Sequence, residues 1–131
     1  MSYDYLHLLA DAAKEQPDII YTFEVVREDT LTKKRKAFEG YVAATREAIQ
    51  WALTSPDKAA EISVATLPDL PHEETATAIK AYAKRNFWES TGKLPEKSLN
   101  ATVALMLDSG QLKRPVAYAD FVATEFTAGK P

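Results

Sequence analysis

Apolar residues recur along most of the chain at spacings of three and four, which places side chains on one face of an α-helix. The longest run starts at Thr30 or Thr32 and predicts a helix that extends to about Leu53. Its broad apolar stripe comprises Phe38, Tyr41, Val42, Thr45, Ala48, Ile49 and Ala52. A shorter helix is predicted over residues 4–15, which contain no glycine or proline.

Prolines mark the starts of two further helices. In Ser55-Pro56 the serine is a predicted N-cap, and the proline takes the first helical position, where its missing N–H costs nothing. This helix is predicted to end near Leu67. The next is predicted to run from Pro71 to about Arg85, with acidic residues early and basic residues late, as the helix dipole favours.

Glycine and proline also divide the last third of the chain. Gly92 and Pro95 bracket a predicted loop, and a helix over residues 95–109 is predicted to stop at Gly110. A short helix further on is predicted to place four apolar side chains on one side: Tyr118, Phe121, Val122 and Phe126. Residues 127–131 are predicted to be loose.

Residues 18–27 break the helical pattern. Their sequence, DIIYTFEVVR, is rich in β-branched and aromatic residues and predicts a β-strand with both faces largely covered. A buried strand must pair its N–H and C=O groups, yet no other segment is an equal partner. Three interpretations follow. The strand pairs with its copy in a homodimer through Ile19–Val26, it belongs to a sheet whose other strands lie outside these residues, or the segment is not a strand. The chain is thus predicted to be mainly α, with about six helices and one strand, in a single domain over residues 1–131.

Three segments, in order, carry a resemblance to a known family. The first segment, similar to a strand that returns the chain from one lobe to another, is IIYTFEVVRED. The second, similar to a long helix followed by a Ser-Pro-x-x-Ala-Ala step, is KAFEGYVAATREAIQWALTSPDKAAEI. SLNATVALMLDSGQLKRPVAYADFV is similar to a last long helix, a glycine turn and a closing helix. Together, about residues 18–126 resemble the C-terminal portion of ABC-transporter solute-binding proteins of the nitrate/sulfonate/taurine and thiamine-pyrimidine-precursor group.

The resemblance implies the C-terminal segment of a periplasmic-binding-protein-like α/β fold, without the first-lobe strands and most of the second lobe. In that family two lobes clamp a small solute, such as a sulfonate, nitrate, taurine or a pyrimidine precursor, and deliver it to an ABC permease. It implies a periplasmic location, no cofactor and no catalysis. Tyr21, Phe23 and Glu24 lie on the segment that the resemblance brings near the inter-lobe cleft, so they are the expected ligand-binding residues.

Two alternative functions follow from other classes. In the first alternative, the chain is part of an enzyme, because the same scaffold serves pyrimidine-precursor synthases and desulfinases. The absence of cysteine and the two separated histidines, His7 and His72, argue against that chemistry in this chain. The other is a stand-alone, self-associating interaction domain that uses the strand.

Composition limits the possible partners and location of the chain. The chain has 131 residues and a net charge of −3, which does not favour nucleic acid as a partner. It contains no cysteine, no stretch long enough to span a bilayer, and no basic-then-apolar start typical of a signal peptide. We therefore expect a cytoplasmic location if the chain is complete.

The remaining candidate groups favour ordinary structural roles. His7 and Asp11 share a helix spacing, but no third or fourth ligand accompanies them, so no metal site is predicted. His72-Glu73-Glu74 is interpreted as an acidic helix start, and Lys33–Lys36 as a solvated helix start balanced by nearby acidic residues. The glycosylation pattern at Asn100 falls inside a predicted helix and is discounted. Three large aromatic residues are expected to be packing anchors: Trp51, Phe87 and Trp88.

Overall fold

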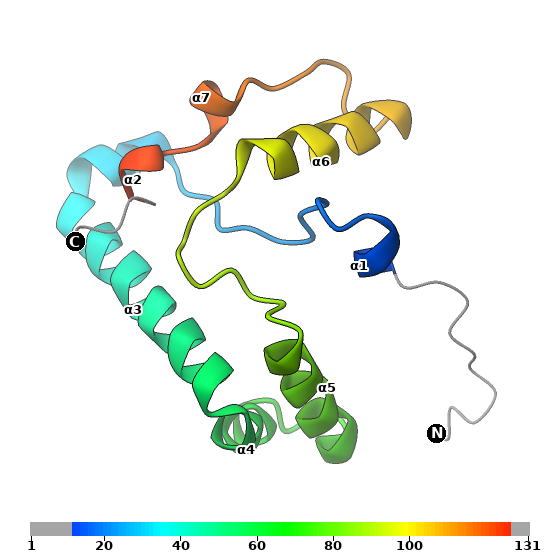
Figure 1. The fold of residues 1–131 in the computed structure, drawn as a ribbon. Coiled ribbons are helices and arrows are strands. Elements are labelled where there is room, and N and C mark those ends of the chain that lie inside the picture. The colour runs from blue at the N-terminus through cyan, green and yellow to red at the C-terminus, as the bar shows by residue number, and fades with distance from the viewer. Residues whose placement is uncertain (1–11, 127–131) are drawn as a thin grey trace. The chain divides into compact units, whose positions relative to one another are not determined.

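A computed structural model describes residues 12–126, and within these residues the chain is mainly helical with no β-strand. The described part divides into two compact units (Figure 1). One unit combines residues 12–25 with residues 94–123, and the other combines residues 26–93 with residues 124–126. The prediction of a mainly α chain is therefore confirmed.

The larger unit consists of four α-helices and a closing turn. Its helices are α2 (Glu28–Lys33), α3 (Arg35–Thr54), α4 (Pro56–Thr66) and α5 (His72–Lys84), and a 3₁₀ turn, η1, spans Thr124–Phe126. Helices α4 and α5 pack side by side, with α3 contacting both. Small side chains are buried in this unit: Ala59, Ala60 and Ala83. Alanines let two helix backbones approach closely, which explains how a short α4–α5 pair packs.

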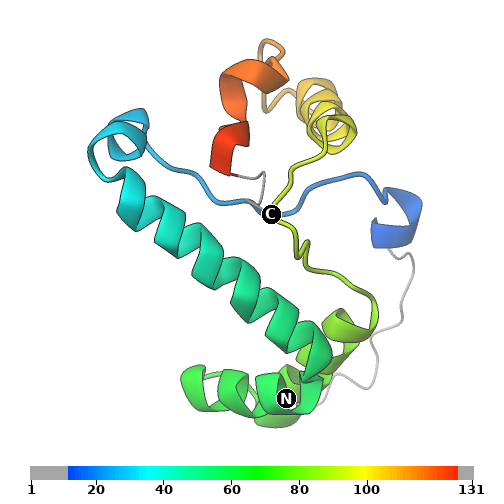
Figure 2. The same ribbon diagram turned by 60° about the vertical axis from the view of Figure 1, so that its left-hand side comes forward.

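Figure 2 shows α3 as the longest helix, as the apolar stripe predicts, but its start is not where the sequence placed it. Helical structure already begins at Glu28, breaks at Lys34 and resumes at Arg35. At the break, Lys34 has φ −126° and ψ 30°, outside the helical region. No glycine or proline marks this position, so the prediction of one continuous helix from residue 30 or 32 is wrong.

The two helices predicted from prolines are confirmed. Helix α4 begins at Pro56 and ends one residue before Leu67, and α5 begins directly after Pro71. The predicted side-chain cap at Ser55 is not formed; only the position of the helix start is correct. The first turn is instead closed by the backbone, since the Ala59 N–H donates to the Ser55 carbonyl at 3.0 Å.

The smaller unit contains α1 (Ala12–Glu15), α6 (Glu96–Asp108) and α7 (Tyr118–Phe121). Its buried side chains all come from α6: Leu99, Thr102 and Val103. The predicted stop at Gly110 is confirmed, because Gly110 has φ +72°, a conformation that glycine adopts without strain. Most of the helix predicted over residues 4–15, with His7 and Asp11, lies outside the described residues, as does the tail 127–131.

The predicted closing helix is shorter than expected. Helix α7 ends at Phe121, and Val122 is extended, with φ −107° and ψ 116°. Phe126 therefore does not share a helix face with Phe121. Instead, the Phe126 ring packs edge-on against Phe38 with ring centroids 4.9 Å apart, and the Arg35 guanidinium lies 4.7 Å from its centre.

The predicted strand at residues 18–27 is not formed within the described chain. Residues 19–27 have no regular secondary structure, and α2 starts directly after them. The physical reason is the lack of a partner: β-rich composition favours an extended chain, but a strand requires a neighbour for its backbone hydrogen bonds. Composition thus identified where the helical pattern stops, but not a sheet.

Candidate functional site

The extended segment at residues 19–25 is the candidate site, and it exposes large apolar side chains. Tyr21 is 51% exposed, Phe23 44% and Val25 77%. Figure 2 shows this segment as an extended trace that follows α1. Three such side chains on alternate positions of an extended chain form a contact surface that a folded protein normally covers.

Contacts to α6 and α7 hold one side of the segment in place. The Ile20 N–H donates to the Thr102 hydroxyl at 2.9 Å, and that hydroxyl donates to the Ser98 carbonyl at the same distance. The Phe23 ring meets the Phe121 ring edge-on, with centroids 5.4 Å apart. Thr102 thus provides for Ile20 the hydrogen bond that a neighbouring strand would otherwise supply.

A largely exposed ion pair lies at the start of the same segment. The Lys97 ammonium lies 2.7 Å from the Asp18 carboxylate. Lys97 belongs to the first turn of α6, so three points along α6 and α7 hold residues 18–23: an ion pair, a backbone hydrogen bond and an aromatic contact. The segment is positioned although it belongs to no sheet.

Glu24 lies on this segment with its carboxylate in solvent. It is exposed and makes no ion pair or hydrogen bond with any described residue. Two aromatic rings and a carboxylate suit a ligand with a planar ring or an ammonium group. Residues 19–26 contain no cationic side chain, so a positive charge for an anionic solute must come from elsewhere.

The predicted ligand-binding residues therefore share one segment. Tyr21 and Phe23 occupy alternate positions, while Glu24 points to the opposite face in an extended chain. The structure does not enclose them: all three are exposed in the smaller unit. Their role in binding a solute stays a prediction.

A second ordered feature, which sequence reasoning missed, is the loop at residues 89–93. The Glu89 carboxylate accepts hydrogen bonds from the Thr91 hydroxyl at 2.7 Å, the Thr91 N–H at 3.0 Å and the Lys93 N–H at 2.9 Å. Gly92 has φ +78°, and a β-carbon there would lie 3.2 Å from Cδ of Arg46. The sequence E-S-T-G-K, a carboxylate followed by Thr and Gly, is the signal that could have identified this turn.

The environment of Glu89 shifts its titration. Burial raises the pKa of the Glu89 carboxyl, but hydrogen bonds from the Thr91 hydroxyl and from the backbone N–H groups of Thr91, Gly92 and Lys93 together lower it by more. The net pKa lies below the ordinary value of 4.5. A lowered pKa means that the ionised carboxylate stabilises the fold above pH 4.5, and that this contribution is lost as the pH falls through the lowered value.

We expect Glu89→Gln to reduce the melting temperature at pH 7 and to reduce its dependence on pH between about 5 and 3. The amide has one acceptor oxygen in place of two and cannot serve all the donors of the loop. Melting curves of both proteins across that pH range provide the test. A matched control is Glu61→Gln, which changes an exposed glutamate of α4 that accepts no hydrogen bond in the described chain. Parallel pH profiles for Glu89→Gln and the unmodified chain would contradict the assignment.

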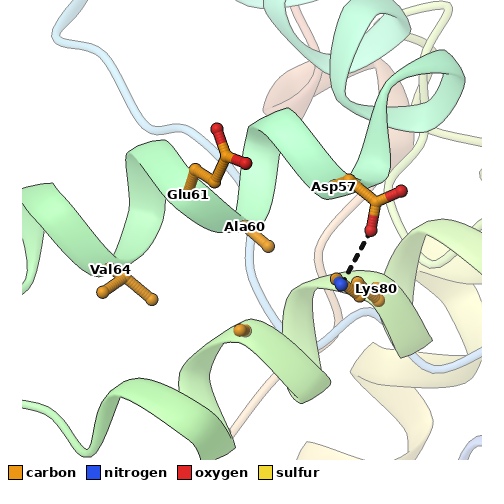
Figure 3. Close-up of a pocket in the computed structure, with 6 residues that line it drawn as sticks. Asp57, Ala60, Glu61, Val64 and Lys80 are labelled. Atoms are coloured by element: carbon orange, nitrogen blue, oxygen red, sulfur yellow. Dashed lines mark ion pairs between the residues drawn. The ribbon is translucent and has the colours of Figure 1, made fainter.

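An open groove lies between α4 and α5 (Figure 3). Its lining residues are Asp57, Ala60, Glu61, Val64, Ala76 and Lys80. At one end the Lys80 ammonium pairs with the Asp57 carboxylate at 2.7 Å, with both side chains at least half exposed. Exposed pairs of this kind contribute about 0–1 kcal/mol to stability. Because Lys80 is paired with Asp57, it does not provide an unpaired cation in the groove.

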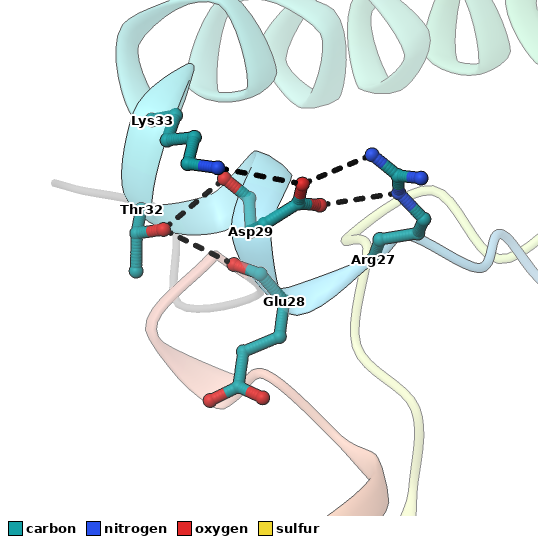
Figure 4. A network of polar contacts seen from close by, with 5 residues as sticks. All are labelled: Arg27, Glu28, Asp29, Thr32 and Lys33. Atoms are coloured by element: carbon teal, nitrogen blue, oxygen red, sulfur yellow. Dashed lines mark hydrogen bonds and ion pairs between the residues drawn. The ribbon is translucent and has the colours of Figure 1, made fainter.

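The basic run Lys33–Lys36 is exposed, as predicted, but it spans the end of α2, the break at Lys34 and the start of α3 rather than one helix start. Figure 4 shows the Asp29 carboxylate between two cations. Arg27 donates hydrogen bonds to it from Nε and Nη2 at 3.1 and 2.9 Å, and the Lys33 ammonium forms an ion pair with it at 3.8 Å. Thr32 bonds back to the Asp29 carbonyl at 3.1 Å. Arg35 pairs with Glu39 at 3.0 Å. These charges neutralise one another within α2 and α3.

The other candidate residues also occupy structural positions. His72, Glu73 and Glu74 form the exposed first turn of α5, and Asn100 lies within α6, as predicted. The expected packing anchors are partly confirmed. Tyr82 stacks on Phe87 with centroids 4.7 Å apart and meets Trp88 at 5.8 Å, whereas Trp51 is 40% exposed.

Residues 12–126 contain no group of three or more His, Cys, Asp or Glu side chains placed to hold a metal ion. No helix in that range is long and apolar enough to cross a bilayer. Comparison with protein-family models, curated proteins and solved structures gives no significant match.

Proposed function

We propose that this chain forms the C-terminal portion of a solute-binding protein that serves an ABC-type uptake system. The observation that carries the proposal is the order of its elements. A long helix, α3, is followed by a Ser-Pro step into α4, and later α6 ends in a left-handed turn at Gly110 before the short α7. The helices and the glycine turn follow the order that the resemblance of residues 18–126 implies, although the strand that the resemblance places before them is not formed in the described chain.

The exposed apolar side chains support the proposal that further protein covers this chain. Large hydrophobic residues remain at least 40% exposed on helices and connections of the larger unit: Tyr41, Trp51, Ile62, Leu67, Leu70, Tyr82 and Phe87. Single exposed apolar residues are ordinary. Seven large exposed apolar residues in a unit with few buried residues, however, indicate faces that pack against further protein. In the proposed function, the remaining lobe structure covers these faces.

The mechanism would be closure of two lobes on a small solute, with no bond made or broken. Tyr21, Phe23 and Glu24 would approach the cleft from this part of the protein. Their chemistry favours an aromatic pyrimidine precursor or the ammonium end of taurine over nitrate. The rings of Tyr21 and Phe23 match a planar ring, and the Glu24 carboxylate, on the other face of the segment, matches an ammonium. The partner is the ABC permease, and the location of the working protein is periplasmic.

The test uses the native protein from its source cells, captured with an antibody against residues 56–66. We expect an intact mass well above that of 131 residues and a higher melting temperature with a pyrimidine precursor or taurine. A solute at 100 times its dissociation constant adds about 2.7 kcal/mol to the free energy of unfolding.

Glu24→Gln in the same native protein should weaken the solute response, while Glu61→Gln, on the exposed side of α4, should leave it unchanged. A folded native protein whose melting temperature is unaffected by all four solute classes would refute the transport function. A response that Glu24→Gln leaves intact would refute only the placement of the site.

A further inference from the structure

Arg46, on α3, is the one lysine or arginine between residues 12 and 126 that is half-buried rather than exposed. Its Nε atom is closed off from solvent and has no hydrogen-bond partner among the described residues. None of these residues forms an ion pair or hydrogen bond with the rest of its guanidinium. A buried donor of a charged group is costly to leave without a partner, so such groups are rare in native proteins and call for an explanation.

The neighbouring sequence supplies no counter-charge for Arg46. The residues three and four positions away on the helix are Val42, Ala43, Ile49 and Gln50, and none of them is acidic.

Two other arginines of the same unit show the usual arrangement. The Nε of Arg27 donates to the Asp29 carboxylate at 3.1 Å, and the Nε of Arg35 donates to the Glu39 carboxylate at 3.0 Å. Arg46 therefore differs from them in both burial and pairing.

The turn at residues 89–93 holds the stem of the Arg46 side chain. A β-carbon at Gly92 would lie 3.2 Å from Cδ of Arg46, so the stem packs directly against the turn at that glycine. The Gln50 amide, one helical turn after Arg46, donates to the Ser90 carbonyl at 3.5 Å and connects the same turn to α3. The Glu89 carboxylate orders the turn through the hydrogen bonds described above. The guanidinium thus extends from a stem that is already fixed, which lowers the entropy cost of binding a ligand.

The two terminal nitrogens of Arg46 remain accessible. Nε is the only side-chain atom of the described residues that is both buried and without a hydrogen-bond partner. Nη1 and Nη2 have no partner either, so they reach solvent. Together they present two parallel N–H donors and a positive charge, a fork that matches two oxygens of a carboxylate, sulfonate or phosphate.

We propose that Arg46 is the binding residue of a site for a small oxyanion, which its Nη1 and Nη2 groups hold through two hydrogen bonds. The oxyanion supplies the negative charge that the described chain does not. Glu89 does not fill this role, because its carboxylate accepts hydrogen bonds from within the turn and forms no ion pair with Arg46. The site goes beyond the proposed transport function and does not depend on it. Arg46 and residues 89–93 belong to the larger unit, whereas Tyr21 and Glu24 belong to the smaller one.

An NMR titration of the 131-residue chain with inorganic phosphate tests the site, with sodium chloride adjusted to keep the ionic strength constant. We expect the guanidinium N–H signals of Arg46 and the amide signal of Gly92 to shift together and to saturate. The Nε–H signals of Arg27 and Arg35 are internal controls and should not shift, because these groups already bind carboxylates. Parallel titrations with acetate and methanesulfonate show which oxyanion the site prefers. The proposal would be overturned if Arg46 responded to none of the three anions, or if all three arginines shifted alike.

Arg46→Met provides an independent test, because it removes the charge and the unpaired Nε donor while a stem of similar length remains. Without added oxyanion, we expect the melting temperature to rise by about 3 °C or more, since a cost is removed and no hydrogen bond is lost. Lys36→Met, at an exposed position of the same helix, is the control and should change the melting temperature little. A lower melting temperature for Arg46→Met alone would show that Arg46 already has partners in the free protein, and the proposal would be wrong.

Arg46→Lys separates the fork from the charge. Lysine keeps the positive charge but lacks the paired donors, so we expect the dissociation constant for phosphate, followed at the Gly92 amide, to rise about tenfold or more. An unchanged dissociation constant would rule out two-point binding by Arg46.

Discussion

Replacing Leu99 with alanine is expected to lower the free energy of unfolding by about 2–5 kcal/mol, the largest effect of any single truncation that we predict. Leu99 is only 3% exposed and lies on the buried face of α6 beside Thr102 and Val103. The loss has two parts: the apolar transfer energy of the removed atoms, and the cavity that the small surrounding core fills incompletely.

The matched control is Leu105→Ala on the same helix, where the leucine is 51% exposed. Helix propensity changes equally in both variants, so the difference between them isolates burial. Urea unfolding with linear extrapolation gives the two free energies, and equal slopes show that the unfolded states are comparable. Similar losses at residues 99 and 105 would show that α6 does not pack as described.

Leu99→Ala should also affect the candidate site. Thr102 lies one turn after Leu99 on α6 and binds the Ile20 N–H. Loosening α6 should therefore increase hydrogen exchange at the Ile20 amide more than at amides of α4, which belongs to the other unit. This local readout links the core of the smaller unit to the position of residues 19–25.

The sequence predicts helix boundaries well where one residue type determines the backbone. Proline at position 56 fits only the first turn of a helix, and glycine at position 110 takes a positive φ, so both boundaries were found from local chemistry. The break at Lys34 has no such residue. At this break, Lys34 has non-helical backbone angles, and the Thr32 hydroxyl donates a hydrogen bond to the Asp29 carbonyl. Neither feature can be predicted from the pattern of hydrophobic residues.

The candidate site shows a second kind of limit. Composition located residues 18–27 as β-rich, but a strand depends on a neighbour that composition cannot supply. The Thr102 hydroxyl that binds Ile20 is 82 residues away in sequence and lies in a predicted helix, so nothing near residue 20 signals it. The Glu89 turn is not predicted for a different reason: Gly92 indicates only that a loop lies there, and no hydrophobic pattern signals the hydrogen bonds of the Glu89 carboxylate.

The packing of α4 on α5 leads to the second large effect. Ala60→Leu is expected to lower the free energy of unfolding by about 1–3 kcal/mol, because overpacking forces side chains off their rotamers or the helices apart. Ala60 is 2% exposed and lines the groove at the side facing α5 (Figure 3). Leucine and alanine have nearly equal helix propensity, so the loss reports on packing.

Ala65→Leu, at an exposed position of the same helix, is the control and should change stability by less than about 0.5 kcal/mol. Urea unfolding monitored by Trp fluorescence measures both variants. If the two leucines have the same small effect, α4 and α5 do not pack through their alanines. A large loss confined to Ala60→Leu would mean that this helix pair is already closely packed in the 131-residue chain, although much of its apolar surface elsewhere stays exposed. Separating these two properties matters for the proposed transport function, since a preformed helix pair with exposed faces can be covered by a further lobe without refolding.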